Sequence, residues 1–81
     1  PVMILDYRVT KGGRYSIELV QTTAANDAIL YDIVCKTRGK VTAKSCNYPS
    51  LDLAQADFAK RINLARCVDG INYQSTQKEG K

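Results

Sequence analysis

Apolar and polar residues alternate in four blocks along the first half of the chain, and shorter polar or small-residue stretches separate the blocks. Alternation with a period of two is typical of β-strands that bury one face. It predicts strands over residues 2–9, 15–23, 28–36 and 41–48. The third block has β-branched and aromatic residues on both faces, so we expect it at the centre of the sheet.

The stretches between the blocks are short and rich in turn-forming residues. Residues 11–13 contain two glycines, residues 24–27 break the alternation, and residues 37–40 turn the chain at Gly39. Glycine adopts positive φ angles without steric penalty, which suits tight hairpin turns. Successive strands with such connections are expected to form an antiparallel meander.

After the fourth block the apolar spacing changes to three or four residues, which predicts a helix with one apolar face. Ser50 is a good N-cap, and Asp52 lies in the first turn, where the helix dipole favours an acid. Gly70 is suited to end the helix, with Arg66 in its last turn. The expected apolar stripe consists of Leu51, Ala54, Phe58, Ile62, Ala65 and Val68.

This element order predicts an α+β fold, in which a four-stranded antiparallel sheet carries one C-terminal helix on one face. The other face is left to water or to a partner. A chain of 81 residues suits a single domain with a modest core. We expect that domain to span residues 1–73, and the polar residues 74–81 to form a tail without regular structure.

Charge singles out one of the turns. The chain has a formal charge of +4, and no acidic residue occurs between Asp32 and Asp52. A mild basic excess slightly favours nucleic acid or an acidic protein as a partner. The basic residues of this stretch surround a glycine turn, and we expect them to contact phosphates. The candidate nucleic-acid-binding residues are Lys36, Arg38, Gly39, Lys40 and Lys44, joined by Arg14 from the first turn.

The residues that usually carry catalysis or metals are scarce. The chain has no histidine and only three cysteines, whose spacing matches no zinc motif. Its acids are scattered, and Asp32 is interpreted as an outward-facing strand residue that pairs with a lysine. The glycines form no phosphate-binding loop. We therefore expect no enzyme activity, no metal and no cofactor.

Targeting signals are also missing from the pattern. Residues 1–9 lack the basic start and the long apolar run of a signal peptide. No apolar stretch is long enough to span a membrane. Unpaired cysteines suit a reducing compartment. The prediction is an intracellular protein, cytoplasmic or nuclear, that does not insert into membranes.

The glycine turn also resembles a known motif. The run Arg38-Gly39-Lys40-Val41 is similar to the Trp-Gly-Arg-Val core that names the WGR domain, which occurs in DNA-damage-dependent poly(ADP-ribose) polymerases and in small bacterial proteins. Residues 13–19 resemble the strand that precedes this core in the family. Ser50, Ala54 and Phe58 look like its helix entry, and Arg66 with Gly70 resembles its closing Lys-x-x-x-Gly-Tyr.

The resemblance implies a twisted antiparallel sheet with one packed helix and a role in contacting DNA. In the family the Trp and Arg lie against sugar and phosphate at a broken DNA end. Arg38 and Lys40 would hold those two places here, and Arg38 replaces the signature Trp. A guanidinium can stack and can also fork onto phosphate. A protein-interaction module that docks by its sheet face or edge remains the alternative.

Overall fold

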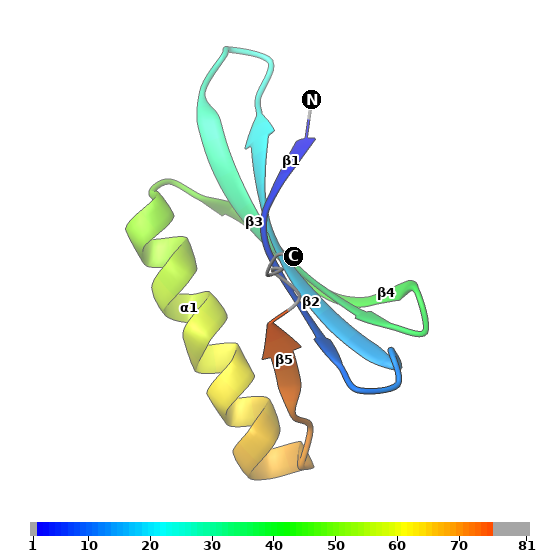
Figure 1. Cartoon of the computed structure of the whole chain (residues 1–81). Helices are drawn as coiled ribbons and strands as arrows, with labels where there is room; N and C mark the ends of the chain where they lie inside the picture. Colours follow the sequence, from blue (N-terminus) through cyan, green and yellow to red (C-terminus); the bar gives the residue numbers. More distant parts are fainter. Residues whose placement is uncertain (1, 76–81) are drawn as a thin grey trace.

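The computed structural model describes residues 2–75 of the chain. Within them five strands, one α-helix and one π-helical turn follow each other along the sequence (Figure 1). The elements are β1 (Val2–Thr10), β2 (Tyr15–Thr23), β3 (Ile29–Thr37), β4 (Lys40–Tyr48), α1 (Leu51–Leu64), η1 (Ala65–Asp69) and β5 (Tyr73–Ser75). The four long strands thus lie within one residue of the predicted boundaries.

The strands form one antiparallel sheet in the order β4-β3-β2-β1-β5. The predicted α+β fold is confirmed, because the four long strands follow meander order and α1 packs on one face of the sheet (Figure 1). The second and third strands are central, as the apolar residues on both faces of residues 28–36 indicated. The first and third turns consequently lie at the same end of the sheet, and the second turn lies at the other.

The core lies between the two central strands and the helix. Ile17, Leu19 and Ile33 come from β2 and β3, and they are almost completely buried against Ala54 and Phe58 of α1. Leu19 and Ile33 are cross-strand partners, so they present adjacent side chains to the helix. Burial of such apolar surface is the main stabilising contribution in a domain of this size.

The helix begins as its sequence predicts, but α1 ends at Leu64, and Gly70 ends the π-helical turn η1 that follows it. The Oγ atom of Ser50 accepts a hydrogen bond from the backbone N–H of Leu53 at 3.2 Å, and Gly70 adopts the left-handed conformation with φ of 69°. The expected apolar stripe is wrong at Val68, which is 69% exposed. The chain widens into the π-helical turn η1 after Leu64, and a wider turn rotates later residues off the buried face.

Strand β5 was not predicted. Tyr73, Gln74 and Ser75 pair with Thr10, Val9 and Arg8 of β1, so the expected irregular tail is wrong for residues 74 and 75. The turn at Gly70 returns the chain to the edge of β1 that β2 leaves unpaired. The hydrogen bonds there join backbone groups, so the pattern of apolar and polar side chains does not predict them. The remainder of that expected tail, residues 76–81, lies outside the described residues.

Polar side chains join α1 to the edge strand β4. The Tyr48 hydroxyl donates a hydrogen bond to Asp57, and the Arg61 guanidinium donates one to Ser45. Arg61 Nε also lies 3.7 Å from Asp57 Oδ2. The hydrogen bond to Asp57, together with burial, raises the pKa of the Tyr48 hydroxyl. These contacts hold the helix over the β4 side of the sheet.

Asp32 has a different role from the expected one. It is buried, and its Oδ1 accepts a hydrogen bond from the backbone N–H of Asn47 at 2.9 Å. The pairing of β3 with β4 shifts register between Tyr31 and Ile33, and Asn47 has a φ of 67° there. Asp32 therefore satisfies a backbone donor at a bulge, and within residues 2–75 it forms no ion pair with a lysine.

Candidate nucleic-acid interface

The candidate site is built on two turns that lie side by side. The backbone N–H of Arg38 donates a hydrogen bond to the carbonyl oxygen of Arg14 at 2.6 Å, which links the β3–β4 turn to the β1–β2 turn. Arg38 and Gly39 have φ angles of 53° and 83°. Positive φ at both central residues is characteristic of the tightest hairpin turns. The two arginines are thus held together by backbone, whatever their side chains contact.

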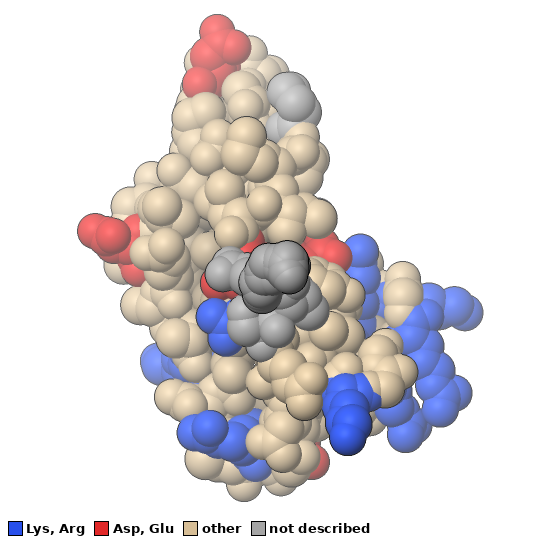
Figure 2. Space-filling model, viewed as in Figure 1, with Lys and Arg blue, Asp and Glu red and all other residues tan. Residues whose placement is uncertain are grey.

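Four cations project from these two turns. We call Lys11, Arg14, Arg38 and Lys40 the cationic end, and all four residues are exposed. Within residues 2–75 none of them forms an ion pair. Figure 2 shows Lys and Arg side chains gathered at this end of the sheet, with a smaller group over the later part of α1. Acidic side chains occupy the opposite tip, where the β2–β3 turn carries Asp27.

Lys36 does not belong to this group. Its Nζ lies 3.2 Å from Glu18 Oε2, and the two side chains are 30% and 12% exposed. The Lys36 side chain projects from the sheet face opposite the helix, where Glu18 lies diagonally across the β2–β3 pairing. The phosphate contact of Lys36 stays a prediction, and the structure shows that its ammonium is already paired with an acid.

The other predicted residues are divided between two positions. Lys40 pairs with Thr37 directly after the turn, so it joins the cationic end. Lys44 pairs with Val34 farther along β4 and is exposed, so it flanks the cationic end without forming part of it. An ideal Cβ at Gly39 would contact nothing within 4 Å. The backbone of this turn is therefore open to a ligand.

Lys11 was not among the predicted residues, although Arg14 of the same turn was. The available signal was topological, since a meander brings its first and third turns to one end of the sheet. Hydrogen bonds make the first turn rigid: Gly13 N–H donates to Thr10 O at 2.9 Å, and Tyr15 N–H donates to Thr10 Oγ1 at 3.2 Å. Lys11 and Arg14 are consequently held on a well-defined loop.

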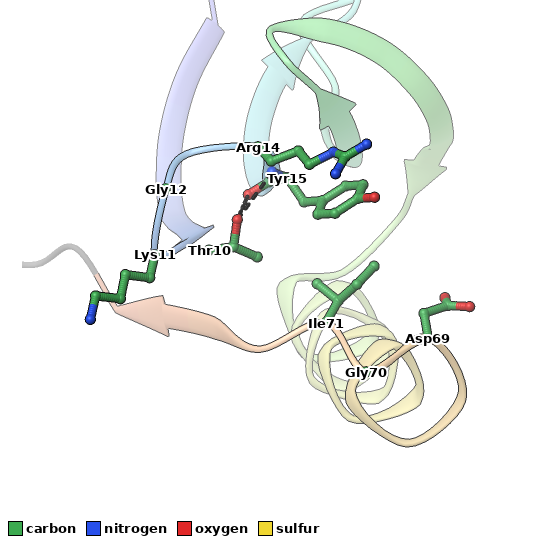
Figure 3. A pocket seen from close by; sticks show the side chains of 8 residues that line it. All are labelled: Thr10, Lys11, Gly12, Arg14, Tyr15, Asp69, Gly70 and Ile71. Atoms are coloured by element: carbon green, nitrogen blue, oxygen red, sulfur yellow. Dashed lines mark hydrogen bonds between the residues drawn. The ribbon is translucent and has the colours of Figure 1, made fainter.

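An aromatic ring supports the second cation of that loop. The Arg14 guanidinium carbon lies 5.5 Å from the centroid of the Tyr15 ring, which is within the range of a cation–π interaction. Figure 3 shows the Arg14 side chain extended along this ring. Such a contact orients the guanidinium while leaving its N–H donors able to bind an anion.

A groove of about 770 Å³ lies between the β1–β2 turn and the end of the helix. Thr10, Lys11 and Tyr15 line one side, and Asp69 and Ile71 line the other. Tyr73 lies close by, and burial raises the pKa of its hydroxyl, with smaller contributions from Cys35 and from Asp69. The groove is thus a mixed polar and apolar surface that continues from the cationic end.

Comparison with family models, with curated proteins and with solved structures finds no match to this chain. The resemblance to the WGR domain therefore rests on the residues quoted above. Among the described residues no helix is long and apolar enough to cross a membrane. Residues 2–75 also contain no cluster of three or more acidic or cysteine side chains that could hold a metal ion.

Proposed function

We propose that this protein binds nucleic acid by contacting its phosphate backbone with the cationic end. The observation that carries the proposal is the hydrogen bond between Arg38 and Arg14, which holds two basic turns together at one end of the sheet. Four exposed cations from separate parts of the sequence can then face one polyanion. Lys44 extends the same positive region along β4.

The chemistry of these groups suits phosphate. Two guanidiniums can fork onto phosphate oxygens, and two ammonium groups act as compact charges. The open backbone at Gly39 allows close approach of a strand. Phosphate contacts position a protein on nucleic acid without reading its sequence, so we expect the cationic end itself to bind with low sequence specificity. The resemblance of residues 38–41 to the WGR core favours the same surface.

Salt dependence provides the direct test. Neutralising about four phosphates gives a log–log slope of about −3.6 for duplex DNA and about −2.8 for a single strand. We expect the double variant Arg38→Ala and Lys40→Ala to lose about half of that slope and to bind more weakly at low salt. Fluorescence anisotropy with labelled oligonucleotides at several salt concentrations measures both quantities.

A matched control uses a cation elsewhere. Lys60→Ala removes one positive charge from the exposed surface of α1, so its salt slope should stay close to that of the wild type. The proposal fails if the protein binds no oligonucleotide at low salt, or if the double variant and Lys60→Ala are indistinguishable.

One observation favours the alternative, a protein-interaction module. Val2, Met3 and Ile4 of β1 are 69%, 56% and 56% exposed, and among residues 2–75 only β2 pairs with them. An exposed apolar edge can accept an uncharged extended segment of another protein as an added strand. Complex formation that survives high salt and nuclease, and that is lost in Met3→Lys, would support this second candidate.

A further inference from the structure

The groove beside the cationic end has a polar character that changes along its length. Figure 3 shows Lys11 and Asp69 at opposite ends, with Tyr15 and Ile71 between them. All four residues line the same groove. A ligand that fills the groove therefore contacts a cation at one end, two largely apolar side chains in the middle and a carboxylate at the other end.

The two charged ends select opposite parts of a ligand. An anionic group is attracted to Lys11 and repelled from Asp69, whereas the Arg14 guanidinium lies over the Tyr15 ring, away from the Lys11 ammonium (Figure 3). The Asp69 side chain is exposed, and within residues 2–75 it has neither an ion pair nor a hydrogen bond. An ionised carboxylate only accepts hydrogen bonds. The far end of the ligand must therefore present N–H or O–H donors.

The middle of the groove suits a flat ring. Tyr15 and Ile71 are both half-buried and line it together. Aromatic side chains are common stacking surfaces for unpaired bases, and apolar side chains pack against the other face. The volume of about 770 Å³ lies within the usual range of small-molecule sites.

From this arrangement we infer that the groove binds one unpaired nucleotide, and that guanine is the preferred base. The phosphate lies at Lys11, the base packs between Tyr15 and Ile71, and the base edge donates hydrogen bonds to Asp69. Guanine presents an N1–H and an adjacent amino group, which match the two oxygens of a carboxylate. Uracil and thymine present one N–H between two carbonyl oxygens, and a carboxylate repels those oxygens.

This inference rests on the proposed function and adds a choice of ligand to it. In a duplex the Watson–Crick edge of guanine is occupied by its partner base. The groove consequently favours single-stranded nucleic acid, or an unpaired nucleotide beside a duplex, over a fully paired duplex. The cationic end supplies phosphate contacts in each case, so the preference comes from the groove alone.

The test compares short single strands of equal length that carry one central guanine or one central thymine. We expect the wild-type protein to bind the guanine strand about tenfold more tightly. In Asp69→Asn that ratio should fall close to one, since the amide offers one acceptor and one donor, while the salt slope stays unchanged. Asp27→Asn is the control, because it removes the same charge at the opposite end of the sheet, and it should keep the preference.

One further ligand identifies the source of the nucleotide, and the combined results separate the possible failures. Competition by free guanosine monophosphate supports binding of the isolated nucleotide, and a guanine preference without such competition supports a nucleotide within a strand. Salt-dependent binding without base preference, or a preference that persists in Asp69→Asn, overturns this inference alone. Absence of salt-dependent binding to every oligonucleotide overturns the proposed function together with it.

Discussion

The backbone N–H of Arg38 donates a hydrogen bond to the carbonyl oxygen of Arg14, which makes one structural unit of two turns that are far apart in the sequence. The bond uses main-chain atoms only, so it persists when either side chain is replaced. Side-chain substitutions at these two positions can therefore remove charge while leaving the framework intact. This property allows binding and stability to be measured separately.

Replacing Arg38 by asparagine should separate the two effects. Arg38 has a φ of 53°, and asparagine tolerates this left-handed conformation well, particularly before glycine in a tight hairpin turn. We expect Arg38→Asn to leave the free energy of unfolding unchanged or higher by about 0.5 kcal/mol. The salt slope on duplex DNA should fall by about 0.9, which corresponds to one lost phosphate contact. Urea unfolding and anisotropy titrations measure these values, and an unchanged slope would remove Arg38 from the interface.

Lys11 and Lys36 should respond in opposite ways to substitution. Lys11→Ala removes an exposed cation of the cationic end, so the salt slope on duplex DNA should decrease by about 0.9. Lys36→Ala should leave the slope unchanged, because its ammonium is already paired with Glu18 at 3.2 Å. It should instead lower the free energy of unfolding by about 1 kcal/mol, since Glu18 is left mostly buried without a partner. A reversed pattern would show that the Lys36–Glu18 pair opens when nucleic acid binds.

Phe58 and Val68 test how far the apolar stripe of the helix contributes to stability. Phe58 is 4% exposed in the core, and Phe58→Ala should cost about 3–5 kcal/mol. Such a loss is comparable to the whole stability expected for a domain of this length. Val68→Ala should change the free energy of unfolding by less than about 0.5 kcal/mol, because Val68 is an exposed surface residue. Denaturant unfolding of both variants provides the comparison. A large decrease in the free energy of unfolding for Val68→Ala would contradict the exposed position that η1 gives to Val68.

Two tyrosines make stability depend on alkaline pH. The hydrogen bond to Asp57 and burial raise the pKa of Tyr48 above its usual 10.0, and burial raises that of Tyr73. A raised pKa means that the folded state retains these protons more strongly than the unfolded state. Their contribution is therefore fully present below pH 10 and is lost as the pH rises through the folded-state values. Tyr48→Phe should lower the free energy of unfolding near neutral pH and make its decline above pH 10 shallower. Unfolding curves at pH values on both sides of 10 test this. If the free energy of unfolding of Tyr48→Phe declines as steeply as that of the wild type, Tyr48 does not contribute to the pH dependence.

Local periodicity accounts for most of the secondary structure that the sequence predicted correctly. The alternation of residues 15–23 and the cap at Ser50 depend only on neighbours along the chain. Short connections then restrict the strands to a meander, which also places the turn at Gly39 beside the first turn. The positive charge of that turn could also be predicted from the sequence, because Arg38 and Lys40 flank the glycine directly.

The sequence by itself therefore determined the four long strands, the helix and the turn that carries the candidate site. Tertiary structure decided that Lys36 is paired with an acid, since its contact with Glu18 depends on cross-strand register. It also decided that Asp32 is buried and that β5 joins the sheet. The groove at Asp69 exists because the chain returns to β1 after the helix. These features depend on contacts between residues distant in sequence, which no local pattern encodes.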